Sequence, residues 1–160
     1  MKRLLPLVLF AVLATAGFAR IGDPLEKFRA RFGKGPDPQS PRGKAVWFIE
    51  VEDGVLVYTV TVDDKGRSIA EGIKPLKRAQ FPREIAQEFI DDQLALVKDS
   101  KTARRLRPGE QYTFAGQAFV CGKDEFVVVD EPRDLLVVWE QGGIPSVMAL
   151  TRAVLQPSGK

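Results

Sequence analysis

The Asp53-Gly54 pair constrains the fold of this chain more than any other feature, because it separates two runs rich in β-branched and aromatic residues. The runs cover residues 45–52 and 55–62. Two such runs joined by Asp-Gly predict a β-hairpin, and this pair tolerates the positive φ angles of a type I′ turn. A further turn at residues 63–66 leads into a third run at 67–73. The sequence therefore predicts a three-stranded antiparallel meander.

An amphipathic helix is predicted ahead of this meander, over residues 24–32. Three apolar residues fall on one face at i, i+3 and i+7: Leu25, Phe28 and Phe32. Asp23, followed three residues later by Glu26, is typical of a capping box. Gly33 supplies a left-handed stop at the C-terminal end of the helix. Residues 33–43 are rich in Pro and Gly, so they are expected to form a loop.

The second helix is predicted over residues 82–97, with one face covering the sheet. Its apolar residues recur with a period close to 3.6: Ile85, Ala86, Phe89, Ile90, Leu94 and Val97. Five more strands are predicted at residues 111–115, 117–121, 125–130, 134–139 and 145–151. The runs at 125–130 and 134–139 are continuously apolar, which predicts strands covered on both faces. The order of elements predicts a single-domain α+β fold, in which antiparallel β-meanders carry two main helices packed against the sheet.

Six aromatic residues lie in predicted strands: Trp47, Phe48, Tyr58, Phe114, Phe119 and Trp139. Aromatic side chains on an open sheet face form a ligand platform, whereas those between a helix and a sheet fill the core. We expect this set to belong to the core.

The first 19 residues have the pattern of a secretory signal peptide. Two basic residues precede a short apolar segment at residues 4–13. The small residues of Ala14-Thr15-Ala16 and of Gly17-Phe18-Ala19 both suit signal peptidase, so the sequence leaves the cut open between Ala16 and Ala19. The apolar run up to Phe18 has 15 residues, fewer than the roughly 20 that span a bilayer. We therefore expect an exported protein, periplasmic or secreted, that is not membrane-spanning after cleavage.

The chain is predicted to divide into a signal peptide, one folded domain and a tail. The signal peptide covers residues 1–19. The domain consists of residues 20–44, with the first helix and the Pro/Gly-rich loop, and residues 45–155, the α+β part. Residues 156–160 are expected to form a flexible tail. Removal of the signal peptide takes away two basic residues and lowers the formal net charge from +3 to +1, so charge gives no reason to expect nucleic-acid binding.

Composition excludes several kinds of catalytic site. The chain has no histidine, which excludes Ser-His-Asp triads, Cys-His dyads and histidine-ligated zinc or haem. Its one cysteine, Cys121, excludes an internal disulfide and every Cys-x-x-Cys motif. We expect Cys121 to be an unpaired strand residue, the alternatives being an intermolecular disulfide and a nucleophile. The sequence predicts no catalytic residue, no metal site and no cofactor.

Two charged patterns are candidate sites. The stretch from 98 to 107 contains the candidate binding residues Lys98, Lys101, Arg104, Arg105 and Arg107. Such side chains suit anionic lipid headgroups, acidic glycans or an acidic partner surface. Paired carboxylates suit glycoside hydrolysis, and acidic pairs occur at Asp63-Asp64, Asp91-Asp92, Asp124-Glu125 and Asp130-Glu131. For both patterns the alternative is an ordinary solvated loop or turn.

The segments FRARFG, PREIAQEFIDDQL and DEFVVVDEPRDLLVVWEQGG resemble, in this order, small secreted bacterial proteins of uncharacterised function. The helix-then-meander layout is also similar to repeats of the β-lactamase-inhibitor-protein-like and outer-membrane-assembly lipoprotein families. The assembly lipoproteins carry a lipidated cysteine near the N-terminus, which this chain lacks. The resemblance implies an extracytoplasmic α+β fold that binds proteins.

The sequence thus predicts an exported, non-catalytic binding or interaction module whose partner is another envelope or secreted protein, or an anionic surface. Two alternatives stay open. One is a small hydrolase that uses carboxylates. The other is a cell-envelope assembly or structural factor that contacts anionic lipid or membrane proteins. The oligomeric state is also open.

Overall fold

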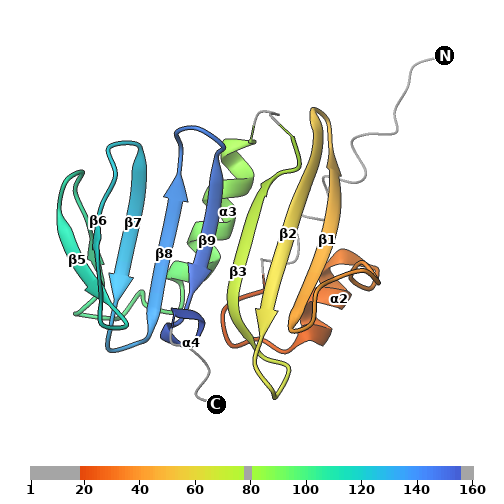
Figure 1. Ribbon diagram of the computed structural model, residues 1–160, viewed down its shortest axis with the longest axis horizontal. Helices are drawn as coiled ribbons and strands as arrows, with labels where there is room; N and C mark the ends of the chain where they lie inside the picture. The colour runs from red at the N-terminus through yellow and green to blue at the C-terminus, as the bar shows by residue number, and fades with distance from the viewer. Residues whose placement is uncertain (1–18, 78–80, 156–160) are drawn as a thin grey trace.

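The computed structural model describes residues 19–77 and 81–155, and it shows a seven-stranded antiparallel sheet with the two longer helices packed on one face (Figure 1). The strands lie in the order β1-β2-β3-β9-β8-β7-β4, and β5 and β6 form a separate hairpin. The strands are β1 (Lys44–Val51), β2 (Gly54–Val62), β3 (Ser68–Pro75), β4 (Arg104–Arg105), β5 (Gln111–Phe114), β6 (Gln117–Val120), β7 (Glu125–Asp130), β8 (Leu135–Glu140) and β9 (Ser146–Leu150). The helices are α2 (Leu25–Phe32), α3 (Arg83–Leu94) and α4 (Arg152–Leu155). This arrangement confirms the predicted α+β fold class.

Most element boundaries agree with the prediction to within a few residues, and the exceptions are short. The two-residue β4 and the one-turn α4 were not predicted, and α3 ends at Leu94 rather than at 97. The predicted signal peptide as far as Phe18 and the predicted tail at 156–160 lie outside the described residues. In the part of the chain that the structure describes, no helix is long and apolar enough to cross a membrane.

The capping box predicted for α2 is wrong. Pro24 occupies the N-cap with extended backbone angles, so Asp23 lies one residue too early to cap the helix. The Asp23 carboxylate instead accepts hydrogen bonds from Lys27 Nζ at 2.7 Å and from the backbone N–H of Arg20 at 2.9 Å. The predicted stop at Gly33 is confirmed by its φ of 64°. Asp23 therefore ties the incoming chain to the helix without capping it.

The β1–β2 hairpin is confirmed, but its predicted type I′ turn is wrong. Among the described non-glycine residues only Ala115 and Asp134 have a positive φ, so Asp53 lacks the angle that such a turn requires. Ala115 and Gly116 both have a positive φ, of 53° and 77°, and they connect β5 to β6. The two positive φ angles of a type I′ turn are thus found at this second hairpin.

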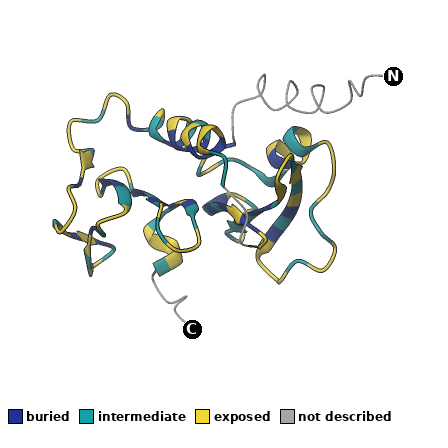
Figure 2. Ribbon diagram, turned by 90° about the horizontal axis from the view of Figure 1, so that it is seen from above, coloured by how far each residue is buried: buried dark blue, intermediate teal, exposed yellow. Residues whose placement is uncertain are grey.

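An aromatic core fills the space between the sheet and the two longer helices, which lie on one side of it (Figure 2). The ring of Phe28 in α2 lies 6.1 Å from Trp47 of β1 and 6.3 Å from Tyr58 of β2. The ring of Phe89 in α3 lies 6.1 Å from that of Tyr58. All four side chains are at most 1% exposed. Full burial of such a side chain contributes about 1.5–3 kcal/mol, so these rings hold both helices to the sheet.

A second apolar cluster lies on the opposite face of the sheet, under the β5–β6 hairpin and α4. It contains Phe114 and Cys121 from the hairpin region, Val127 from β7 and Leu136 from β8, and Leu155 of α4 packs against it. Strands β7 and β8 are therefore covered on both faces, as their continuous apolar runs predicted. Strands β1 and β2 also carry side chains on the hairpin side of the sheet. These side chains belong neither to this cluster nor to the aromatic core.

Candidate functional site

The hairpin side of strands β1, β2, β3 and β9 carries an apolar surface that we call the open face. Side chains alternate between the two faces of a strand, so Phe48 points away from the core that buries its neighbour Trp47. Phe48 is 38% exposed and Met148 of β9 is 37% exposed. The open face is made up of exposed Phe48 and Met148, half-buried Val46, Val55, Thr59 and Gly72, and buried Val57. Phe48 is the exception to the expectation that the strand aromatics fill the core.

Strand register makes the open face continuous. Thr59 of β2 lies opposite Val46 of β1 and opposite Gly72 of β3, and Gly72 lies opposite Met148 of β9. Because neighbouring strands are about 4.8 Å apart, this row extends for roughly 15 Å across four strands. Gly72 has no side chain, so the surface has a shallow depression between Thr59 and Met148.

Charged residues border the open face. Lys44 and Glu50 share its side of β1 with Phe48, and Lys74 lies opposite Val57 on β3. Lys34, just after α2, donates a hydrogen bond from Nζ to the backbone oxygen of Phe48 at 3.1 Å. Three lysines and one glutamate thus surround an apolar centre.

A polar network is buried between β2, β3 and α3. Its centre is Glu71, which is 2% exposed. Glu71 Oε2 accepts hydrogen bonds from the Tyr58 hydroxyl at 2.7 Å and from Gln93 Nε2 at 3.1 Å, and Oε1 lies 3.0 Å from Ser68 Oγ. Burial raises the pKa of Glu71 to about 8, while the hydrogen bonds from Tyr58, Ser68 and Gln93 oppose this shift and nearby Asp23 adds to it.

The contacts of Ser68 are compatible with a protonated Glu71 carboxyl, the form that its raised pKa favours. Ser68 Oγ lies 3.0 Å from the backbone oxygen of Arg20 as well as 3.0 Å from Glu71 Oε1. A hydroxyl has one hydrogen to donate, so it cannot donate to both acceptors. Ser68 Oγ can donate to Glu71 Oε1 when that carboxyl is ionised; when the carboxyl is protonated, Glu71 can instead donate to Ser68 Oγ and leave the Ser68 hydrogen for the Arg20 oxygen. Glu71, whose pKa is strongly raised, is thus buried in the core, where its hydrogen bonds join β2, β3 and α3.

The acidic pairs singled out in the sequence are spread over separate elements. They lie in the β2–β3 turn, on α3 and at the two ends of β7. One carboxylate of each pair accepts a local hydrogen bond. Asp63 accepts hydrogen bonds from the backbone N–H groups of Lys65 and Arg67, and Asp91 accepts one from Gln87 Nε2. Glu125 accepts a hydrogen bond from the backbone N–H of Gly122, and Asp130 accepts one from the Thr102 hydroxyl. Each pair thus has one carboxylate already engaged in a local hydrogen bond.

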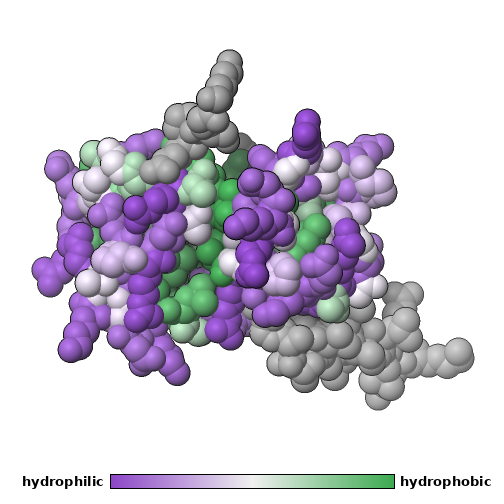
Figure 3. Space-filling view, turned by 90° about the horizontal axis from the view of Figure 1, so that it is seen from below, coloured by the Kyte–Doolittle hydropathy of each residue, from purple (hydrophilic) through white to green (hydrophobic). Residues whose placement is uncertain are grey.

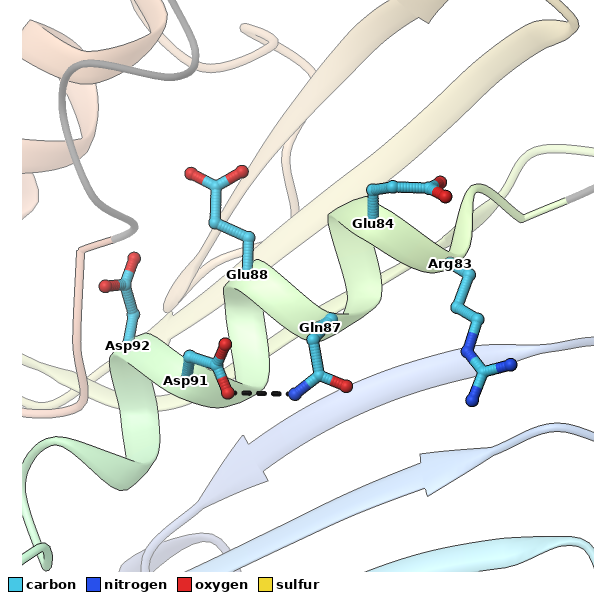
Figure 4. Close-up of a pocket in the computed structure, with 6 residues that line it drawn as sticks. All are labelled: Arg83, Glu84, Gln87, Glu88, Asp91 and Asp92. Carbon is cyan, nitrogen blue, oxygen red and sulfur yellow. Dashed lines mark hydrogen bonds between the residues drawn. The ribbon is translucent and has the colours of Figure 1, made fainter.

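The outer surface of α3 carries four acidic side chains, Glu84, Glu88, Asp91 and Asp92, beside Arg83 and Gln87 (Figure 4). Glu84, Glu88 and Asp92 line one side of a shallow depression of about 480 Å³, and Gln87 and Asp91 line the other. Burial raises the pKa of Glu88, and the guanidinium of Arg31, 3.7 Å away, opposes this shift. The depression is an open helix face without an enclosed substrate cleft.

The basic stretch does not form one continuous surface. All five candidate residues are exposed, but β4 is extended, so Arg104 and Arg105 point to opposite sides. Arg104 forms an ion pair with Glu110 at 3.0 Å. The Arg105 guanidinium lies 4.6 Å from the ring centre of Phe126. Lys98 and Lys101 lie in the loop before β4, and Arg107 follows it. Two of the five charges are thus engaged within the chain.

A small apolar pocket lies at the end of the molecule where α3 and β9 finish and β8 begins. It measures about 440 Å³, and Ile21, Leu96 and Leu135 line it together with Arg133 and Asp134. Viewed from this end, the surface shows an apolar band between hydrophilic flanks (Figure 3). The polar residues at the pocket have partners, because Arg133 donates to the backbone oxygen of Leu96 and Asp134 pairs with Arg152.

Cys121 follows β6 and is 1% exposed, packed in the cluster under the hairpin. It is a free thiol in the structure. Burial raises its pKa, and the nearby carboxylates of Glu125 and Glu110 raise it further. A raised pKa and a closed environment leave little of the reactive thiolate at neutral pH.

We therefore expect Cys121 to react slowly with thiol reagents in the native protein. The rate of alkylation by iodoacetamide at pH 7.5 should be roughly 100-fold or more below the rate in urea, because reaction requires opening of the hairpin. Mass spectrometry of quenched samples measures both rates. Native alkylation as fast as in urea would show that the thiol is accessible.

Comparisons with protein-family models, with curated proteins and with solved structures found no match to this chain.

Proposed function

We propose that this protein is an exported, non-catalytic interaction module whose open face binds an apolar segment of another extracytoplasmic protein. The observation that carries this proposal is the exposure of Phe48 and Met148 on a sheet whose opposite side is closed by two helices. Contiguous apolar surface on a small protein is typical of protein–protein contact sites. The leader pattern in the first 19 residues supports export.

Charge indicates the chemistry of the partner. Lys34, Lys44 and Lys74 border the open face against the single acid Glu50. An apolar segment flanked by aspartate or glutamate is complementary to this arrangement. The apolar part supplies most of the affinity through burial, and the charges favour a partner of this kind over a basic one.

Site-specific photo-crosslinking in the native host tests this proposal. The full chain carries p-benzoylphenylalanine at position 48, and the control carries it at position 120, where Val120 is equally apolar and 60% exposed but belongs to the hairpin. We expect a discrete protein adduct from position 48 and none from position 120. Met148→Asp should reduce the adduct at least roughly tenfold, because it buries a charge in the contact. The matched variant Val120→Asp should leave it unchanged.

Other outcomes contradict the proposal. Equal adducts from both positions, or an adduct that survives Met148→Asp, would show that the open face does not bind the partner. Binding to anionic vesicles at low salt that Arg104→Ala with Arg105→Ala weakens would identify an anionic surface as the partner instead. Retention of the full chain in the cytosol would contradict export.

A further inference from the structure

We infer that the segment bound at the open face is an amphipathic α-helix of the partner protein, with its apolar stripe on the sheet and acidic residues beside the stripe. This inference rests on the proposed function and names the conformation of the partner segment. In Figure 1 the open face is turned toward the reader, and α3 lies behind the sheet. A sheet with one exposed apolar face is completed by a second packed layer, which a helix can supply.

The edge of β1 is not free to pair with an extended segment beside the open face. β1 is the outermost strand of the sheet. The backbone oxygen of Val46 accepts the N–H of Asp37 at 2.7 Å, and the N–H of Val46 donates to Ser40 Oγ at 3.1 Å. Lys34 Nζ donates to the backbone oxygen of Phe48 at 3.1 Å. The loop that follows α2 thus protects this edge against the addition of a strand.

The open face also lacks groups that could satisfy an extended backbone lying on it. Strands β2, β3 and β9 have neighbours on both sides, so their backbone groups pair within the sheet. Among the residues that make up the face, only Thr59 has a polar side chain. An extended segment would bury its own N–H and C=O groups against apolar side chains, which is unfavourable. A helix pairs these groups internally, so it can bury an apolar stripe without this cost.

The shape of the open face accommodates a helix. The row from Val46 to Met148 extends for roughly 15 Å across four strands, wider than one extended strand and wide enough for a helix of about 10–12 Å. The depression at Gly72 lies between Thr59 and Met148. Ala70 is the next residue of β3 on this side, so only a methyl group borders the depression along the strand. Side chains of a helix can enter there.

Charge determines which residues flank the apolar stripe of the helix. Phe48, Val57 and Lys74 are in register on β1, β2 and β3. Lys34 Nζ lies at the backbone oxygen of Phe48, so one lysine lies on each side of Val57. Aspartate or glutamate on both flanks of the stripe is complementary to these two ammonium groups. The partner helix is therefore expected to carry an acid on each flank.

Photo-crosslinking from two positions measures the conformation of the bound segment. The full chain carries p-benzoylphenylalanine at position 55 or at position 61, which lie on the same side of β2 and six positions apart. In a strand this separation is roughly 20 Å. Mass spectrometry identifies the partner residue joined to each position. A helix rises about 1.5 Å per residue, so the two adducts should lie about 10–13 residues apart on the partner. An extended segment covers this distance in about six residues.

The segment that position 48 captures gives a second measurement. Proline is placed at the centre of that segment, outside its crosslinked side, and alanine at the same place is the matched control. Proline should reduce the adduct at least roughly tenfold, because it breaks a helix, and alanine should leave it unchanged. An extended segment on the face would tolerate both substitutions.

The possible failures separate the helix from the proposed function. Adducts about six residues apart, or equal adducts with proline and alanine, would overturn the helix and leave the open face as the binding site. An adduct with the mass of two copies of this chain would identify a second copy as the occupant and overturn the inference. The absence of any adduct from positions 48, 55 and 61 would contradict the proposed function itself.

Discussion

Glu71→Gln is expected to remove most of the pH dependence of stability between pH 5 and pH 8. The pKa of Glu71 is raised from 4.5 to about 8 by burial, so the folded protein holds a proton that the unfolded chain releases. Stability from this group is fully present below pH 4.5 and is lost as the pH rises towards 8. The wild-type free energy of unfolding should fall by about 3 kcal/mol across this window, and that of Glu71→Gln by less than about 1 kcal/mol.

The composition of the chain makes this measurement clean. No histidine is present, so few other groups titrate between pH 5 and pH 8. The charged and titratable groups around Glu71 are Tyr58, whose pKa burial raises well above its ordinary value, and Asp23. Glutamine can accept from Tyr58 and Gln93 and donate to Ser68, so the variant keeps the network.

Urea denaturation at several pH values, followed by circular dichroism, measures the effect of Glu71→Gln. Glu84→Gln is the matched control, because Glu84 lies exposed on α3 and its loss should leave the slope unchanged. A wild-type stability that is constant from pH 5 to pH 8 would show that Glu71 is not held protonated.

The parts of the fold that the sequence predicted are those that local patterns determine. The helices and the long strands follow from residue periodicity and from turns such as Gly33. The two elements that it missed depend on distant contacts. β4 exists because Arg104 and Arg105 pair with β7, and α4 is held by Arg152, which binds Asp134 and the backbone oxygen of Glu131.

The site was less predictable because it depends on which face of the sheet the helices cover. Alternation places Trp47 and Phe48 on opposite faces, but only the packing of α2 and α3 decides which one is exposed. Glu71 did leave a signal, since it falls between Ile69 and Ile73 at spacings of two and so shares their predicted face. Its partner Gln93 comes from α3, 22 residues away, and no local pattern joins them.

Trp47→Ala is expected to lower the free energy of unfolding by about 3–5 kcal/mol, a large share of the 5–15 kcal/mol typical of a domain. The Trp47 ring is 1% exposed and lies 6.1 Å from Phe28 and 5.1 Å from Phe32 of α2. Its Nε1 donates to the backbone oxygen of Lys34 at 3.1 Å. Truncation leaves a cavity and frees α2 together with the loop that follows it.

Phe48→Ala is the matched control for Trp47→Ala, because the two residues are neighbours on β1 with opposite faces. It should cost less than about 1 kcal/mol, since Phe48 is already 38% exposed. Trp47→Phe keeps a ring in the core, so it should fall between the two and give a folded variant if alanine does not. Urea denaturation followed by circular dichroism measures all three. A cost for Phe48→Ala equal to that of Trp47→Ala would mean that the open face is packed against something, and the interaction proposed for it would lose its basis.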